Sequence, residues 1–136
     1  KIDWTVCDAE KLPFKTSSFD VYTIAFGLRN CIDKEKVLSE AFRVLKSGGL
    51  FYCLEFSKVD NKFLNKLYKY YSFKIIPLLG YMIAGQIEPY QYLVESIEKF
   101  YSKNELSDRM EEVGFKDINV DQLNAGIVAI HCGKKI

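Results

Sequence analysis

The sequence lacks the features that mark several classes of protein. Its 19 basic residues are balanced by 18 acidic ones, so it offers no positive surplus for binding nucleic acid. Its four cysteines lie far apart without a CxxC pair, which argues against a zinc site or a disulfide framework and predicts buried free thiols in a reducing compartment. Its most apolar stretch, Ile75 to Gly85, is too short for a membrane-spanning helix, which needs ~20 residues.

Neither a signal peptide nor an initiator methionine is present, and strand-like sequence follows Lys1 directly. We therefore expect the N-terminus to continue a longer protein. What is present is material for a core, because 49% of the 136 residues are hydrophobic and 15% are aromatic. A chain of this length is expected to form one soluble domain and to bury roughly two-thirds of its unfolded surface.

The first residues predict two strands joined by a loop. Ile2 to Cys7 alternates and is rich in β-forming residues, which favours a strand. Asp8 to Ser18 contains Pro13 and a Thr-Ser-Ser cluster, which favours a loop. Asp20 to Phe26 is almost wholly apolar, as expected for a strand buried on both faces of a parallel sheet.

A helix and another strand follow. Asp33 is a suitable N-cap, apolar residues then recur at helical spacing, and Gly48-Gly49 is predicted to end the helix. Leu50 to Phe56 is again a strand-like apolar run. Strand, helix and strand make one βαβ unit, whose two strands are expected to be parallel with a right-handed crossover.

The middle of the chain predicts helices rich in aromatic residues. Lys62 to Ile76 has helical character with aromatic side chains on several faces, and Pro77 and Gly80 are predicted to interrupt it. A further helix is indicated by an apolar stripe at helical spacing, formed by Tyr90, Leu93, Ile97 and Phe100.

The last third predicts a helix and a hairpin. Ser102 and Glu105 fit a capping box, and Gly114 is expected to close the helix that they begin. Ile118–Leu123 and Ile127–Cys132 are predicted strands. A turn-like Asn-Ala-Gly joins them, so this pair is expected to be antiparallel.

Several motifs together resemble one known family, the ubiquinone/menaquinone biosynthesis C-methyltransferases (UbiE family). The most specific are Phe26-Gly27-Leu28-Arg29-Asn30 and Leu54-Glu55-Phe56-Ser57-Lys58. Asp8-Ala9-Glu10-Lys11-Leu12-Pro13-Phe14 also matches, whereas Arg43-Val44-Leu45-Lys46-Ser47-Gly48-Gly49 is shared by many methyltransferases and is weak by itself. The likeness covers essentially the whole chain.

The resemblance implies an α/β fold: a partial Rossmann-like class I methyltransferase sheet, with parallel strands, a C-terminal antiparallel hairpin and a helical insertion at about residues 60–101. It implies S-adenosylmethionine as cofactor and methylation of a carbon on a polyprenylated benzoquinol or naphthoquinol ring. It also implies that residues 1–136 are the C-terminal part of a single domain. The family's glycine-rich turn and ribose-binding acidic residue are expected upstream of Lys1, so the isolated chain is expected to be inactive.

Cofactor contacts follow from the same resemblance, residue by residue. Asp8 and Ala9 match the family's adenine contacts, since a carboxylate can accept from an amine and a loop N–H can donate to a ring nitrogen. The alternative is an acidic loop that caps the next turn. Ala25 matches a position near the methionine part of the cofactor, where only its backbone can make contact; the alternative is strand core.

Arg29 and Asn30 are the candidates for catalysis. C-methylation needs an electron-rich ring carbon, which deprotonation of a neighbouring hydroxyl supplies. Arginine stays protonated, so Arg29 is assigned to stabilise the developing phenolate, Asn30 to hydrogen-bond the same oxygen or a water, and the base is left unassigned. The alternative is a solvated Arg29 beside a turn-capping Asn30. His131, the only histidine, is a candidate base by residue type, but it lies near the end of the last strand, where the alternating pattern points it at solvent, so a structural role is favoured over a catalytic one.

The aromatic middle predicts either a pocket for the quinol ring and its tail or an ordinary helix core. If it is a pocket, Tyr71, Tyr90 and Tyr92 are candidates to orient ring hydroxyls. Two other functions stay open: a non-catalytic module that binds lipid or a partner protein, and a class I methyltransferase acting on a sterol or another small molecule. The expected location is the cytoplasm or the mitochondrial matrix, with peripheral contact at the inner membrane.

The family's sheet places two strands between Ile2–Cys7 and Asp20–Phe26, and the sequence has neither. The strand Asp20–Phe26 is therefore expected to lie at an edge with unpaired backbone groups. We expect the 136-residue chain by itself to be marginal in stability or to form a homodimer, and to bind S-adenosylmethionine weakly or not at all.

Overall fold

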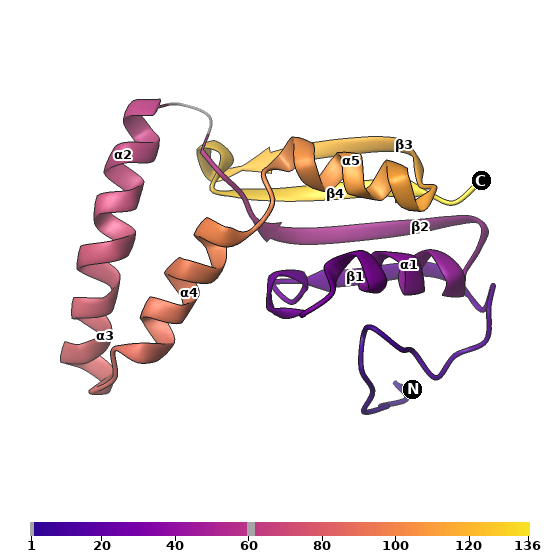
Figure 1. Cartoon of the computed structure of the whole chain (residues 1–136), viewed down its shortest axis with the longest axis horizontal. Coiled ribbons are helices and arrows are strands. Elements are labelled where there is room, and N and C mark those ends of the chain that lie inside the picture. Colours follow the sequence, from indigo (N-terminus) through magenta and orange to yellow (C-terminus); the bar gives the residue numbers. More distant parts are fainter. Residues whose placement is uncertain (1, 60–61) are drawn as a thin grey trace.

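A computed structural model, which describes residues 2–59 and 62–136, arranges four strands in one sheet in the order β1-β2-β4-β3 (Figure 1). The strands are β1 (Phe19–Ala25), β2 (Leu45–Phe56), β3 (Lys116–Leu123) and β4 (Val128–Lys134). The α-helices are α1 (Lys34–Val44), α2 (Lys62–Tyr70), α3 (Ile76–Ala84), α4 (Glu88–Lys99) and α5 (Lys103–Val113). Short turns are η1 (Leu28–Asn30) and η3 (Asn124–Gly126), and η2 (Tyr71–Ile75) is a π-helix.

The predicted βαβ unit is confirmed, because β1 and β2 pair in parallel on either side of α1. The carboxylate of Asp33 caps α1 by accepting from the N–H of Lys36 at 2.9 Å. The helix ends earlier than the glycine pair predicts, since Leu45 is already extended and begins β2. Gly49 is needed for a steric reason instead, because a Cβ there would lie 2.8 Å from the carbonyl oxygen of Lys46.

The C-terminal hairpin is also confirmed. β3 and β4 pair antiparallel, and β4 pairs antiparallel with β2 on its other side, which makes a mixed sheet. The predicted capping box at Ser102 and Glu105 starts α5, and Gly114 follows its end with a φ of 118° that favours glycine.

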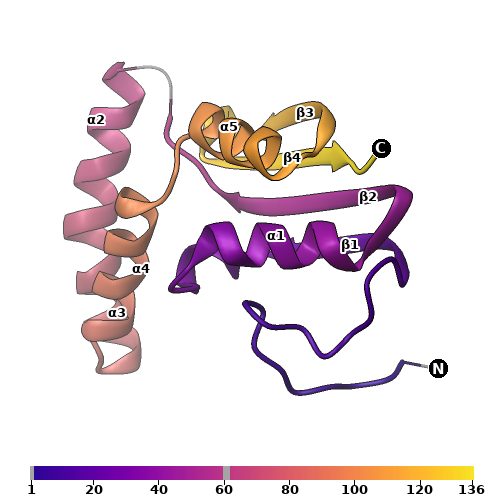
Figure 2. The same cartoon turned by 45° about the vertical axis from the view of Figure 1, so that its right-hand side comes forward.

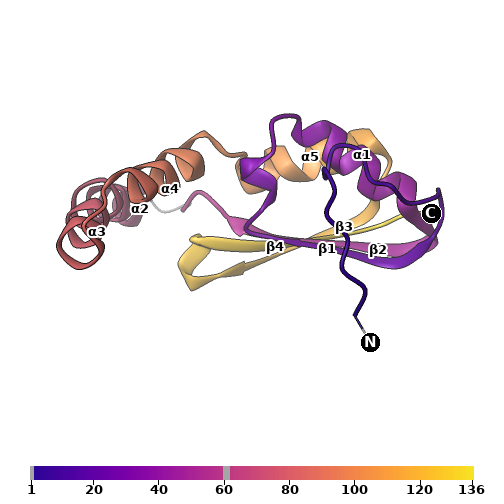
Figure 3. The ribbon, with the colours of Figure 1, turned by 90° about the horizontal axis from the view of Figure 1, so that it is seen from below.

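The core lies between one face of the sheet and the helices α1 and α5, which cover that face side by side (Figure 3). The side chains of Phe51 and Phe115 stack there with ring centroids 5.1 Å apart. Among the described residues no helix lies on the other face. The expectation that Asp20–Phe26 is buried on both faces is therefore wrong, and only Tyr22 and Ile24 of β1 pack toward the core. The expected edge position of this strand is confirmed.

The predicted strand Ile2–Cys7 is absent. This segment has no sheet neighbour among the described strands, and its Trp4 side chain is 89% exposed. A strand needs a partner for its backbone hydrogen bonds, so alternation alone does not form one. The four cysteines are free thiols, but only Cys53 is buried, and Cys7 is exposed, contrary to expectation.

The helices α2, η2 and α3 follow one another as a long rod, and α4 returns beside it; we call these four segments the helical arm (Figure 2). The expected interruption at Pro77 is wrong. The π-helix before it, in which the N–H of Ile76 donates to the carbonyl of Tyr71, gives the wider turn that accommodates a proline ring. The rod ends instead at Gly85, whose φ is 67°. No described helix has the length and apolarity to cross a membrane.

Candidate active site

The carboxyl ends of the two parallel strands meet at one edge of the sheet, beside the helical arm. β1 ends at Ala25, and Phe26 then turns the chain with a left-handed φ of 51° while its N–H donates to the carbonyl of Leu54 at 2.9 Å. This turn leads directly into η1 and places Arg29 over the end of β2. Open α/β sheets bind their ligands at such strand ends.

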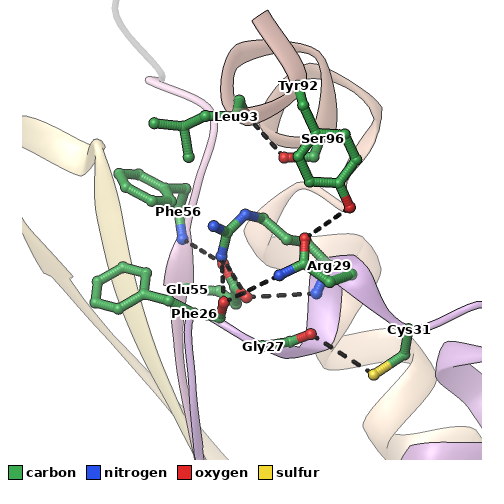
Figure 4. Close-up of polar contacts among 10 residues, drawn as sticks. Phe26, Gly27, Arg29, Cys31, Glu55, Phe56, Tyr92, Leu93 and Ser96 are labelled. Atoms are coloured by element: carbon green, nitrogen blue, oxygen red, sulfur yellow. Dashed lines mark hydrogen bonds and ion pairs between the residues drawn. The ribbon is translucent and has the colours of Figure 1, made fainter. Parts of the chain in front are cut away.

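Arg29 forms a buried ion pair with Glu55, the residue before the last of β2. Nη1 of Arg29 lies 3.1 Å from each carboxylate oxygen of Glu55, and their side chains are 10% and 2% exposed. Nη1 also donates to the carbonyl of Phe26 at 2.6 Å, and the guanidinium lies over the ring of Phe56 at 5.3 Å (Figure 4). The alternative of a solvated Arg29 is therefore wrong.

One buried donor of Arg29, its Nε, makes no hydrogen bond within the described residues. Arg29 lines a cavity of about 200 Å³ together with residues of α1, α4 and the turn that follows α4, namely Lys34, Tyr92, Glu95, Ser96, Lys99 and Phe100. A buried N–H without a partner costs free energy, so this donor is suited to an acceptor oxygen brought by a ligand.

Asn30 is brought together with Tyr92, which is 62 residues away in sequence. The hydroxyl of Tyr92 donates to Oδ1 of Asn30 at 3.0 Å, and Nδ2 of Asn30 lies 3.4 Å from the carbonyl oxygen of Phe26 (Figure 4). Asn30 thus joins the end of β1 to α4, and the second N–H of its amide nitrogen is the donor available to a ligand oxygen.

The other two predicted tyrosines lie elsewhere. Tyr71 lines a second, apolar cavity of about 520 Å³ between the helical arm and the turn after β3, with Val59, Leu64, Leu67, Tyr68, Tyr70, Ile75, Ala125 and Ile127. In the described part of the chain, Tyr90 lines neither the 200 Å³ nor the 520 Å³ cavity. Its ring lies against Gly80, where a Cβ would come within 2.2 Å of a ring carbon.

The cofactor-side residues lie on an exposed loop that is tied to α1. Oδ1 of Asp8 accepts from the N–H of Glu10 at 2.9 Å, which is the turn-capping arrangement, and leaves the second oxygen for another donor. Ala9 packs against the core, whereas Ala25 is exposed at the end of β1. Glu10 in turn accepts from two backbone N–H groups just before α1, those of residues 32 and 33, at 3.0 and 2.9 Å.

A second Glu–Arg pair fixes the rest of this loop. Arg43 donates to Glu40 through Nε at 2.6 Å and Nη2 at 2.8 Å, and to the carbonyls of Phe14 and Leu12 at 2.8 and 3.1 Å. The hydrogen bonds that Glu40 accepts, from Arg43 first and also from the N–H of Leu12, lower the pKa of Glu40 to about 2. The loop that carries Asp8 and Ala9 is thereby held against α1 through residues that the sequence reasoning did not assign.

His131 is buried, and the expectation that it faces solvent is wrong. β4 is an inner strand, and Nε2 of His131 lies 2.9 Å from the carbonyl oxygen of Lys103 at the start of α5. Burial lowers the pKa of His131, which favours the neutral ring. It lines neither of the two cavities.

Glu55 is the functional candidate that sequence reasoning missed. The signal was available, because Glu55 is the single charged residue in the apolar run Leu50–Phe56. Successive strand residues face opposite sides, so Phe51, Cys53 and Glu55 share the helix-covered face, and a charge there needs a partner.

The fold is that of the class I S-adenosylmethionine-dependent methyltransferases. A methyltransferase of Thermotoga maritima superposes with a TM-score of 0.66 at 24% identity, over 94% of this chain and 61% of that one. A methyltransferase of Methanosarcina mazei superposes with a TM-score of 0.63 at 24% identity, over 100% of this chain and 68% of that one.

The chain belongs to the ubiE/COQ5 methyltransferase family, whose family model matches residues 1–135. It is 53% identical over 133 residues to the human mitochondrial 2-methoxy-6-polyprenyl-1,4-benzoquinol methylase, covering 98% of this chain and 41% of that protein. It is also 53% identical to the ubiquinone/menaquinone biosynthesis C-methyltransferase UbiE of Rickettsia akari, covering 99% and 54%. The chain thus spans about half or less of the length of these relatives.

Proposed function

We propose that this chain forms the acceptor side of an S-adenosylmethionine-dependent C-methyltransferase that acts on a polyprenylated benzoquinol or naphthoquinol. The observation that carries the proposal is Arg29, which is held at the strand ends beside the 200 Å³ cavity and whose Nε has no partner in the part of the chain that the structure describes. The names of the human and Rickettsia akari relatives support the substrate class.

S-adenosylmethionine, when bound, supplies an electrophilic methyl group. The second oxygen of Asp8 would accept from the adenine amine, and the backbones of Ala9 and Ala25 would contact the adenine and the methionine part. Arg29 would donate to the quinol oxygen as it loses its proton, and the amide nitrogen of Asn30 would bond the same oxygen or a water. The adjacent ring carbon would take the methyl group as the bond between that methyl and the cofactor sulfur breaks, with S-adenosylhomocysteine as the leaving group, and would afterwards release its own proton.

The 520 Å³ cavity is proposed to take the isoprenoid tail. Its lining is apolar side chains and tyrosine rings, it includes Tyr71, and it lies on the helical arm that also carries Tyr92. A cavity lined in this way suits a hydrocarbon chain, while the smaller cavity with its charged lining suits a ring that bears oxygens.

Two further contacts are proposed. The rod of the helical arm exposes large apolar side chains, among them Phe63, Leu78, Tyr81, Met82 and Ile83, and this suits peripheral contact with a lipid surface, for instance the inner membrane of a mitochondrion. The second contact is association of two copies along β1, whose outer backbone edge pairs with no described strand.

The test uses the longest natural reading frame that contains this chain. We expect methyl transfer from S-adenosylmethionine to demethylmenaquinol or to 2-methoxy-6-polyprenyl-1,4-benzoquinol, and a large loss of transfer in Arg29→Ala. Methyl transfer to sterols with none to either quinol would overturn the quinol proposal, and no transfer together with binding to lipid vesicles would favour the non-catalytic module. The 136-residue chain alone is expected to show weak or no cofactor binding by titration calorimetry.

A further inference from the structure

Glu55 has a buried carboxylate that has no role in the methyl transfer proposed above. Its side chain is 2% exposed, and it ends the row of alternate β2 residues that faces the helices. A charge in such a place is costly unless it is paired and hydrogen-bonded, so its partners indicate what it does.

Its partners converge on Arg29. Both carboxylate oxygens accept from Nη1 of Arg29 at 3.1 Å, and Oε1 also lies 3.3 Å from the backbone nitrogen of the same residue. Within the described part of the chain, the carboxylate accepts one further hydrogen bond, from the N–H of Phe56 to Oε2 at 3.1 Å, which fixes the carboxylate on its strand. Glu55 therefore holds both the guanidinium and the backbone of Arg29.

As a result, the nitrogen atoms of the guanidinium differ in their hydrogen bonds. Nη1 donates to Glu55 and to the carbonyl of Phe26. Nε has no partner among the described residues, and it belongs to a side chain that is nine-tenths buried and lines the 200 Å³ cavity. Figure 4 shows the guanidinium between the end of β2 and α4. A donor that is fixed before the ligand arrives costs no reorganisation when charge develops opposite it.

We propose that Glu55 is a positioning residue for the methyl transfer, which aims Nε of Arg29 at the acceptor oxygen and cancels most of the net charge of Arg29. Arg29 then acts as a directed hydrogen-bond donor to the ionising hydroxyl rather than as a free positive charge. This inference rests on the proposed function, because it specifies how Arg29 meets the quinol.

The kinetic test compares Glu55→Gln with wild type in the full-length protein. We expect kcat to fall about 10- to 100-fold, as for other residues that orient a reacting group, while the KM for S-adenosylmethionine changes little. Glu112→Gln is the matched control, since Glu112 also pairs with an arginine, at 2.7 Å on the exposed face of α5. In an Arg29→Ala background, Glu55→Gln is expected to have almost no further effect on kcat, because Glu55 acts through Arg29.

A second measurement needs no turnover and covers the case in which the quinol is not the substrate. In ¹⁵N-arginine-labelled protein, the side-chain signals of Arg29 are expected to be resolved in wild type and Glu112→Gln, to shift and broaden in Glu55→Gln, and to be partly restored in Glu55→Asp. Unchanged Arg29 signals, or an unchanged kcat in folded Glu55→Gln, would overturn the positioning role. Failure of wild type to methylate any quinol would overturn the proposed function instead, and the NMR result would still decide the role of Glu55.

Discussion

The charged side chain of Arg29 is nine-tenths buried, and its ion pair with Glu55 makes this burial possible. Each charge alone would carry a desolvation penalty, and the hydrogen bonds from Nη1 of Arg29 to both carboxylate oxygens of Glu55 offset part of it. The sequence identified Arg29 from its motif but did not assign Glu55, because the two are 26 residues apart and meet only when β1 and β2 pair.

Arg29→Met is expected to destabilise the protein by about 3–5 kcal/mol, because it leaves the buried carboxylate of Glu55 without its cation. The double variant Arg29→Met, Glu55→Leu is expected to recover most of this loss, since it removes both charges. Urea unfolding measures both. Arg109→Met, which breaks two exposed ion pairs, those with Glu112 and Glu35, is the control and is expected to cost less than about 1 kcal/mol. A double variant as unstable as the single one would contradict this account.

The pair of Glu40 and Arg43 predicts a dependence of stability on pH. The pKa of Glu40 is lowered in the folded state from 4.5 to about 2, so the folded protein binds fewer protons there than the unfolded chain. Its contribution is therefore complete above about pH 5 and is lost as the pH falls toward about 2. The difference in unfolding midpoint between wild type and Glu40→Gln is expected to shrink over this range. A difference that stays constant down to the lowest pH would show that the carboxylate does not act through its charge.

At the scale of elements, local chemistry predicted the start of α1 and both ends of α5 far better than the course of the helical arm. Asp33 and the Ser102–Glu105 box are local signals, and the structure uses them as expected. Pro77 is a helix breaker by local rules, but a π-helix just before it keeps the rod continuous. Whether such a turn forms depends on the packing of the rod against α4, which no local pattern reports.

The apolar cavity of the helical arm can be tested by filling it. Ile75→Trp adds bulk to the lining of the 520 Å³ cavity, so in the full-length protein the KM is expected to rise several-fold for a long-tailed quinol and to change little for a short-tailed one. Leu78→Trp is the control, because Leu78 is 56% exposed on the same rod and lies outside that lining. An equal rise in KM for both tail lengths would show that the cavity does not take the tail.

At the scale of the whole molecule, two surfaces of the sheet are open in the described part of the chain. Helices cover only one face of the sheet, and β1 pairs with a neighbouring strand on only one of its two sides. The uncovered face is apolar, and the outer edge of β1 carries backbone donors and acceptors, so both surfaces favour association. The 136-residue chain by itself is expected to elute as a dimer or larger species in size-exclusion chromatography with light scattering. Lys substitutions at Val21 and Thr23, which are exposed on β1, are expected to shift it toward monomer. A stable wild-type monomer would count against association.

The sequence by itself determined the elements whose signals are local, namely the capped helices, the parallel βαβ unit and the final hairpin, and its motifs determined the family. It failed at Ile2–Cys7, because alternation cannot supply the neighbour that a strand requires. Only the tertiary structure decided the site. It brought Arg29 onto Glu55, joined Asn30 to Tyr92, placed Tyr71 and Tyr90 elsewhere, and buried His131. The physical reason is that a charge or a hydrogen bond is specified by what lies opposite it in space, and these partners come from distant strands and helices.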